Sequence, residues 1–478
     1  MNRKNLVTRH ILKALLPCML FSMPCFADKI KLLEDNTEAL QARVDLIQNA
    51  KKEILVEYYE VASDSLSLTG LALLKEAAGR GVKVKILIDN MHNSLSKAEM
   101  AAMLGVDQNP EIAKNIEIKM FNPLHTLNPL HLTYRNHDKL MNVDGESDEP
   151  MMIVGGRNVA KNYFGKSKDF NFKDADALVV GSSAQVSRKY FMDLWKNNPE
   201  VKDVELYKYS RRNLESNCNT EAGDCDQVVK ALEEIAAAHA KLASYLDTFN
   251  SGKAWVKSEP ISEMLKDLED VETIRFAFND PLKVMKKVEV KLSEQIMGSL
   301  LQRAKESILI VTPYLFPTEE ELTKLEAIAA SGVKIKIVTN SLASTDVVLV
   351  HAAFLTIKKR LADMGAEVYL FKGPEILHCK GAIIDNKISM IGSFNFDRRS
   401  ANINREIGIR VGEVDSHASK FTKEFVEFID KDILANSFLA VSQKKELDTS
   451  EIDSLVTDAK NKELEIEKGK VKFFANQI

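Results

Sequence analysis

Short apolar stretches alternate with amphipathic ones in the first part of the chain. Residues 51–61 (KKEILVEYYEV) are rich in branched and aromatic side chains, which is typical of a β-strand. Leucines and alanines then recur at helical spacing over residues 66–77, and a second apolar run covers residues 81–90 (GVKVKILIDN). This order of strand, helix and strand predicts an α/β arrangement in which buried strands lie between helices.

The same pattern returns in the second half of the chain. Residues 305–315 (KESILIVTPYL) and 332–341 (GVKIKIVTNS) match the two early strands, including the GVK opening. The repeat predicts two similar lobes, each a mixed β-sheet flanked by helices. Further strands are expected at 116–121, 151–158 and 175–180 in the first lobe and at 366–371, 388–395 and 406–411 in the second.

The chain has 478 residues, which is longer than one compact domain. Its start is expected to be a signal peptide, because basic residues precede an apolar run and no acidic residue occurs before Asp28. An uncleaved anchor in the inner membrane is the alternative. The expected parts are a signal peptide at 1–27, an N-terminal lobe at 28–204, a helical connector at 205–290, a C-terminal lobe at 291–435 and a charged tail at 436–478.

A signal peptide implies an exported protein that is periplasmic or secreted and peripheral to the membrane. In such an oxidising compartment Cys218 and Cys225, which flank a polar loop, could form a disulfide. Two free thiols fit equally well if the protein is cytosolic. The formal net charge of −4 argues against a protein that grips long stretches of nucleic acid, so no stable nucleic-acid partner is expected.

One extended motif carries the candidate chemistry. It reads HCKGAIIDNKISMIGSFN over residues 378–395, and six fixed positions in one window are very unlike a chance match. The first half repeats the H, K and D spacing from residue 137 and ends in GGRN at 155–158, with Gly156 in the place of the serine. The candidate residues are His137, Lys139, Asp144 and Asn158 in the first copy, and His378, Lys380, Asp385, Ser393 and Asn395 in the second.

These residue types suit phosphodiester chemistry. One histidine can attack phosphorus, because neutral imidazole is a usable nucleophile near neutral pH. The other can protonate the leaving alkoxide and then deprotonate the incoming water or alcohol. Lysines and asparagine amides supply donors to the phosphate oxygens, with a His and a Lys two apart on a strand facing the same way. Such a set needs no metal or cofactor, and none is expected.

Each histidine also needs an acidic residue to orient it. Glu406 in the last strand of the second lobe is one candidate, and Asp174 occupies the matching place in the first lobe. Asp176 is close enough to compete with Asp174. The motif residues Asp144 and Asp385 are interpreted as structural, ending a strand and pairing with nearby backbone or a cation.

These motifs resemble the phospholipase D superfamily, whose members carry two HKD motifs. The segments GGRNVAKNYFG (155–165), NSLASTDVVLVHAAF (340–354) and GSFNFDRRSANINREIG (392–408) are most similar to bacterial cardiolipin synthases of the C-type branch. The resemblance implies a phosphatidyl-enzyme intermediate with the active site between the two lobes. It assigns His137 as nucleophile and His378 as acid/base. It also implies that each histidine pairs with an acidic residue of the other lobe, His137 with Glu406 and His378 with Asp174. The residues that the resemblance implies for phosphate binding are Lys139, Lys380, Asn158, Asn395 and Ser393.

The expected function is therefore a phospholipase D-type phosphodiesterase or phosphatidyltransferase that acts on glycerophospholipids at a membrane surface. Water as acceptor gives phosphatidic acid, and an alcohol such as phosphatidylglycerol gives cardiolipin. A nuclease of the same superfamily is the alternative, since it shares the catalytic set. The acidic charge balance disfavours a nuclease. Because both motifs lie in one chain, a monomer is expected. A non-catalytic scaffold is disfavoured because both motifs are intact.

Overall fold

The protein is described here by a computed structural model covering residues 28–105, 110–122, 133–206, 225–271, 273–280, 303–413, 415–442 and 445–446. Three features expected from the sequence lie outside these residues. They are the signal peptide, the side chains of the Cys218–Cys225 pair, and the charged tail beyond residue 446.

The described part of the N-terminal lobe is built on a nine-stranded mixed sheet with the order β10-β1-β8-β6-β5-β2-β3-β4-β9. Strands β2, β3 and β4 run parallel, and the other neighbouring pairs are antiparallel. The strands are β1 (Asp28–Leu33), β2 (Glu53–Tyr58), β3 (Lys83–Asp89), β4 (Ile116–Phe121), β5 (Lys139–Val143), β6 (Met151–Gly155), β8 (Asp176–Val180), β9 (Val201–Asp203) and β10 (Glu269–Val271).

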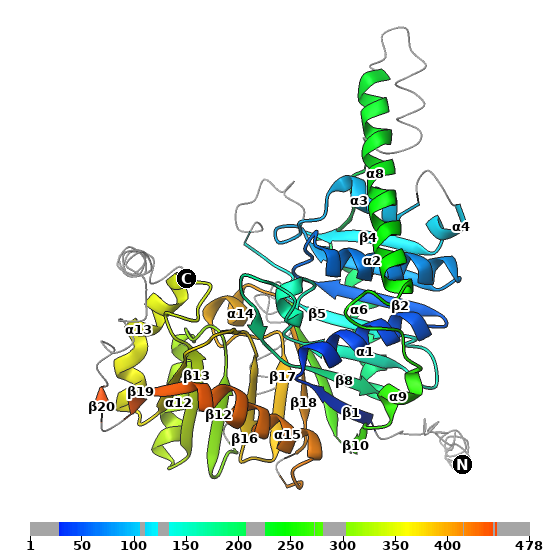
Figure 1. Ribbon diagram of the computed structural model, residues 1–478. Helices are drawn as coiled ribbons and strands as arrows, with labels where there is room; N and C mark the ends of the chain where they lie inside the picture. The colour runs from blue at the N-terminus through cyan, green and yellow to red at the C-terminus, as the bar shows by residue number, and fades with distance from the viewer. Residues whose placement is uncertain are drawn as a thin grey trace, which may run out of the picture.

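The described part of the C-terminal lobe has a second nine-stranded sheet, in the order β11-β18-β17-β16-β12-β13-β14-β19-β20. From β11 to β19 this order matches β1 to β9 of the first sheet strand for strand, so the predicted repeat and fold class are confirmed (Figure 1). The strands are β11 (Ile274–Asn279), β12 (Ser307–Val311), β13 (Lys334–Asn340), β14 (Glu367–Phe371), β16 (Gly381–Ile384), β17 (Ile388–Gly392), β18 (Glu406–Val411), β19 (Ser437–Ser442) and β20 (Lys445–Glu446).

The lobe boundaries differ from those expected from the sequence. Strand β11 comes from the expected connector but pairs with β18, and β19 comes from the expected tail but pairs with β14. Each supplies the position that β1 or β9 fills in the first lobe. The connector helix expected around residues 227–247 is present as α8 (Cys225–Asn250), which projects beyond the body of the molecule in Figure 1.

Helices cover the outer face of each sheet and also fill the space between the two sheets. Helices α1 (Asn36–Asn49) and α2 (Ser65–Gly79) pack on the first sheet, and α8 packs on α2 and α3 (Lys97–Met103). Helices α12 (Glu319–Ala330) and α13 (Val348–Asp363) cover the second sheet. None of the described helices combines the length and apolar character needed to cross a membrane.

The two lobes share an apolar core. Helix α6 (Ser182–Asn197) of the first lobe contacts β11 of the second, and α15 (Lys420–Phe428) of the second contacts β1 of the first. Phe191, Ile391 and Phe425 belong to one buried cluster that contains residues of both sheets. Because this interface is a shared interior, the lobes form one rigid frame.

The two motif aspartates have the structural role that the sequence predicted. Asp144 lies at φ 50° after β5, and its carboxylate accepts backbone N–H bonds from residues 51–53 at 2.7–2.9 Å. Asp385, at φ 51° after β16, accepts the N–H groups of residues 305–307, each at 2.9 Å. Each aspartate therefore links the end of one strand to the start of its neighbour, β5 to β2 in the first lobe and β16 to β12 in the second.

Replacing Asp385 with alanine is expected to lower the free energy of unfolding by about 1–2 kcal/mol, because three backbone donors lose a charged acceptor. Burial raises the pKa of Asp385, but the N–H groups of Ser307, Lys305 and Glu306 outweigh burial and hold this pKa below 3.8. The stabilisation is therefore present above pH 4 and is lost as the pH falls through the lowered pKa. Hydrogen exchange at residues 305–307 measures the effect, with Lys387→Ala as control; equal protection in both variants at pH 7 would contradict it.

Candidate active site

Each HxK segment, His137–Lys139 or His378–Lys380, is held against the opposite lobe by backbone hydrogen bonds. The N–H of His137 donates to the carbonyl of Arg405, just before β18, at 3.1 Å. On the other side β15 (Ile376–Leu377), directly before His378, pairs in parallel with β7 (Phe172–Lys173) of the first lobe. These two bridges bring the start of each motif beside the segment that leads into β18 or β8 of the other lobe.

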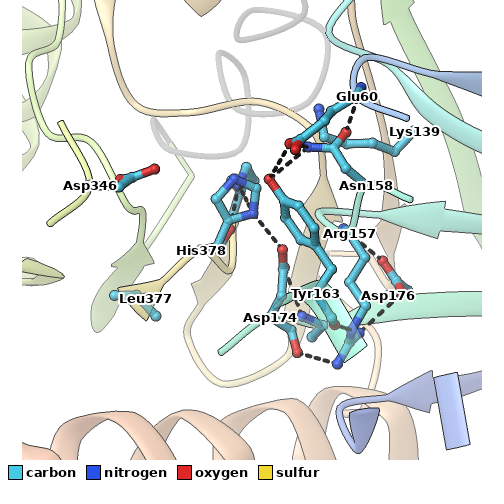
Figure 2. A network of polar contacts seen from close by, with 12 residues as sticks. Glu60, Lys139, Arg157, Asn158, Tyr163, Asp174, Asp176, Asp346, Leu377 and His378 are labelled. Atoms are coloured by element: carbon cyan, nitrogen blue, oxygen red, sulfur yellow. Dashed lines mark hydrogen bonds and ion pairs between the residues drawn. The ribbon is translucent and has the colours of Figure 1, made fainter. Parts of the chain in front are cut away.

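This arrangement places each histidine against a carboxylate of the other lobe. Nδ1 of His137 lies 3.0 Å from Oε2 and 3.1 Å from Oε1 of Glu406. Nδ1 of His378 lies 2.6 Å from Oδ2 of Asp174, as Figure 2 shows. The structure thus brings together the two pairs that the sequence comparison implied. Both motifs contribute to one site, since Nδ2 of Asn158 from the first motif donates to the hydroxyl of Tyr163, whose ring contacts that of His378.

Both imidazoles are neutral near neutral pH. Burial lowers the pKa of His137 well below 6.5, and the charges of Lys139 and Lys380 lower it further. Burial and the same two lysines have the same effect on the pKa of His378. Nδ1 of each ring faces a carboxylate, which favours the tautomer with the proton on Nδ1 and leaves on Nε2 a lone pair that can attack phosphorus or accept a proton.

The carboxylates are buried as completely as the rings that they orient. Burial raises the pKa of Glu406 to about 7, although Lys139 and donated hydrogen bonds oppose this shift. Its donors are the hydroxyls of Ser393 at 2.5 Å and Ser400 at 2.6 Å. Burial likewise raises the pKa of Asp174 to about 7. Each carboxylate is therefore fixed in direction and ready to stabilise an imidazolium when it forms.

Two buried lysines make the site attractive to an anion. Burial, and then the charge of Lys380, lower the pKa of Lys139 to about 7, and burial lowers the pKa of Lys380. Nζ of Lys139 donates to the carbonyl of His137 at 2.6 Å, and Nζ of Lys380 lies 2.7 Å from Nδ1 of His378. A bound phosphate would relieve the repulsion between the two ammonium groups.

The HxK segments differ from the expected strand geometry. His137 precedes β5, which begins at Lys139, and both His378 and Lys380 precede β16. The histidines therefore lie just before the strands rather than within them, although Nζ of Lys380 still faces the ring of His378, as a His and a Lys two apart were expected to do. The inter-lobe bridges, which the sequence pattern could not indicate, set their directions instead.

The expected phosphate-binding residues have different surroundings. Asn395 is 4% exposed, and its Oδ1 has no hydrogen-bond partner among the described residues. Nδ2 of Asn158 instead donates to the hydroxyl of Tyr163 at 2.8 Å. Ser393 donates to Glu406, so the structure gives its hydroxyl a partner other than phosphate. At the matching position of the first lobe, a Cβ on Gly156 would collide with the carboxylate of Asp174, which explains the glycine there.

Asp176 does not compete for His378. Its carboxylate accepts from Arg43 at 2.9 Å and from the guanidinium of Arg157 at 3.1 Å, all within the buried interior. Arg157 also donates to the carbonyl of Asp174 at 2.7 Å (Figure 2). This arginine network fixes the backbone that carries Asp174. The side chain of Asp174 therefore points toward the site, whereas that of Asp176 points into the buried interior of the lobe.

Aromatic residues that the sequence analysis missed flank both histidines. The ring of Tyr59 lies 4.8 Å from that of His137, edge to face, and the ring of Tyr163 lies 5.1 Å from that of His378 in the same geometry. Both tyrosines belong to segments that looked like ordinary strand or loop. The one signal that could have pointed to them is their position beside the motif residues. Tyr59, for example, directly follows Tyr58, which pairs with Lys139 between β2 and β5.

The other described histidines and cysteines lie away from this arrangement or have other partners. His92 and His417 are exposed, whereas His239 is buried with Nδ1 2.9 Å from Nζ of Lys75. Cys379 is a buried free thiol. Within the described ranges, His, Cys, Asp and Glu side chains do not gather anywhere as a group of three or more that could hold a metal ion.

Known proteins are similar to this chain over both lobes. A family model described as cardiolipin synthase, PLD-like domain, matches residues 44–195 and 297–429. The chain is 29% identical over 428 residues to the Escherichia coli K12 protein named cardiolipin synthase C, covering 83% of each chain. It is 30% identical over 407 residues to an uncharacterized protein of Helicobacter pylori J99, covering 79% of this chain and 75% of that protein.

A solved structure shares the fold. Phosphatidylserine synthase from Haemophilus influenzae Rd KW20 superposes with a TM-score of 0.61, covering 94% of this chain and 95% of that one. The two sequences are 14% identical, so the likeness concerns the fold alone.

Replacement by asparagine is expected to affect activity at Asp174 and stability at Asp176. Asp174→Asn should lower kcat by about 10²–10⁴-fold with little change in melting temperature, because it removes the charge that orients His378. Asp176→Asn should lower stability by about 3–5 kcal/mol, because two buried arginines lose their counter-charge. Turnover and thermal unfolding of both variants test this. Loss of turnover in Asp176→Asn without a change in melting temperature would contradict the assignment.

Proposed function

This chain belongs to the family described as cardiolipin synthase, PLD-like domain, and from that membership and the geometry of its site we propose that it transfers phosphatidyl groups between alcohols. The donor is a glycerophospholipid at a membrane surface. The observation that carries the proposal is the crossed arrangement of two buried His–carboxylate pairs around two buried lysines.

The first half of the proposed reaction forms a phosphohistidine. Nε2 of His137 attacks phosphorus while the bond from phosphorus to the headgroup oxygen breaks. His378 gives its proton to that oxygen, so the headgroup leaves as a neutral alcohol. The negative charge of the bound phosphodiester favours the protonated form of His378 that this step needs. Glu406 stabilises the positive charge that develops on the ring of His137.

The second half reverses these roles. The incoming hydroxyl loses its proton to His378, its oxygen attacks phosphorus, and the bond from phosphorus to Nε2 of His137 breaks. Lys139, Lys380 and Asn395 stabilise the charge on the phosphate oxygens throughout. A lipid alcohol as acceptor yields a new phospholipid, and water yields phosphatidic acid.

The reaction class is tested with vesicles of phosphatidylglycerol, phosphatidylethanolamine or phosphatidylcholine, with and without 5% ethanol as a trapping alcohol. We expect added ethanol to divert the phosphatidyl group into phosphatidylethanol, because ethanol attacks the same intermediate as every other acceptor. The Lys139→Met and Lys380→Met variants should lose about 10²–10³-fold in rate. Single- and double-stranded DNA serve as alternative substrates. Cleavage of DNA with no turnover of any of the lipids would replace the proposal with a nuclease.

The roles of the histidines are separated by a phosphatidyl ester of p-nitrophenol, whose leaving group needs no proton. His378→Asn should release one equivalent of nitrophenol per active site and then stall, because nothing deprotonates the acceptor. Mass spectrometry of the acid-labile adduct should place the phosphatidyl group on residue 137. His137→Asn should show no burst. A burst from His137→Asn with the adduct on residue 378 would exchange the two roles.

A further inference from the structure

We propose that Arg399 and His92 form a second phosphate site at the mouth of the active site, which binds the phosphodiester of an acceptor phospholipid. The inference rests on the proposed phosphatidyl transfer and adds to it the acceptor's chemical class. Transfer from one phospholipid to another brings two anionic phosphates close together, and the two histidines hold only the reacting one. The other phosphate needs its own cationic partner.

His92 comes from the N-terminal lobe, on the loop that follows β3. Its ring is exposed and lies 4.4 Å from the ring of Tyr59, centroid to centroid, while Tyr59 also contacts His137. One aromatic ring therefore separates His92 from the proposed nucleophile. The imidazole can donate an N–H bond to an oxygen that lies just outside the catalytic pair.

Arg399 reaches the same side from the C-terminal lobe. It lies in α14 (Arg398–Asn402), its side chain is exposed, and in the described part of the chain its guanidinium donates to one group, the carbonyl of Thr133, at 3.2 Å. Thr133 lies four residues before His137, so this bond places Arg399 beside the segment that leads to His137, and its charge also lowers the pKa of His92 and of His137. A guanidinium with donors left over suits a phosphodiester oxygen.

The opposite side of the mouth would repel an anion. Figure 2 shows Asp346 of the second lobe directed toward His378, with Glu60 of the first lobe close to the Tyr163 hydroxyl. That hydroxyl lies 3.1 Å from Oε2 of Glu60, and the carboxylate of Asp346 accepts from Tyr314 at 2.9 Å. The mouth is thus cationic beside His137 and acidic beside His378, which leaves one side for a second phosphate.

The difference in charge also fixes the direction of the acceptor. With its phosphate on Arg399 and His92, a lipid whose headgroup ends in a hydroxyl can extend that hydroxyl across the reacting phosphorus toward His378. The acceptor then loses its proton to the histidine on the acidic side. A small neutral alcohol uses the same hydroxyl position but makes no contact with Arg399.

The test measures how one intermediate divides between two acceptors. Phosphatidylglycerol vesicles are incubated with a fixed concentration of ethanol, and the ratio of cardiolipin to phosphatidylethanol is measured. Both products come from the same phosphohistidine, so their ratio reports acceptor binding and is independent of the first chemical step. Arg399→Gln should lower this ratio by roughly 10–100-fold, the effect of losing a charged hydrogen bond. His92→Ala should lower it by a smaller factor.

Arg398→Gln is the matched control. Arg398 neighbours Arg399 in α14 and has the same charge, but its guanidinium stacks on Phe316 at 4.3 Å and bonds Glu319 at 3.1 Å. This variant should leave the ratio unchanged. Arg399→Lys should restore part of the ratio, because it restores the charge without the planar donor geometry. Added salt should lower the wild-type ratio, since the phosphate contact is electrostatic.

The outcomes separate the two proposals. If the wild-type protein forms neither product from any lipid, the proposed function fails. If it forms both, and Arg399→Gln has the wild-type ratio or slows both products equally, the second phosphate site is wrong while phosphatidyl transfer stands. If Arg399→Gln does not fold, the ratio measured with Arg399→Lys and its dependence on salt decide the question in the same way.

Discussion

Each motif histidine lies against a carboxylate that belongs to the other lobe, so neither lobe contains a complete site. A shift of about 1 Å between the lobes would break the contact between Nδ1 of His378 and Asp174, which is 2.6 Å long. The shared apolar core and the two backbone bridges prevent such a shift. The buried site therefore depends on how firmly the two sheets are packed together.

A polar network strengthens the same boundary beside the histidines. Arg405, whose carbonyl accepts from His137, forms an ion pair with Asp280 at 2.7 Å, and its guanidinium donates to the hydroxyl of Tyr190 at 3.0 Å. Tyr190 in turn donates to Asp138, the middle residue of the first HxK motif. Burying these charges has a desolvation cost that is acceptable only when every partner is in place. The network therefore favours one relative position of the lobes.

The duplicated strands and the motif residues could be predicted from sequence because both follow local patterns. Apolar runs indicate strands wherever they occur, and the spacing from His378 to Asn395 is contained in one segment. Strands β11 and β19 escaped because polar sequence flanks them, and only a partner strand far along the chain defines them. Tyr59 and Ser400 escaped for a related reason, since their roles come from contacts across the fold.

The two halves of the site have diverged although their strands still correspond. Glu406 receives hydroxyl bonds from Ser393 and Ser400, whereas Asp174 faces Gly156 and accepts the N–H of Ala175 at 2.8 Å. Arg399 and His92 lie near His137 and favour its neutral form, which a nucleophile needs. The carboxylates of Glu60 and Asp346 lie on the side of His378 in Figure 2, although burial and the two lysines still lower the pKa of that ring. The two histidines therefore differ in their surroundings, which fits the proposed attack by His137 and proton transfer by His378.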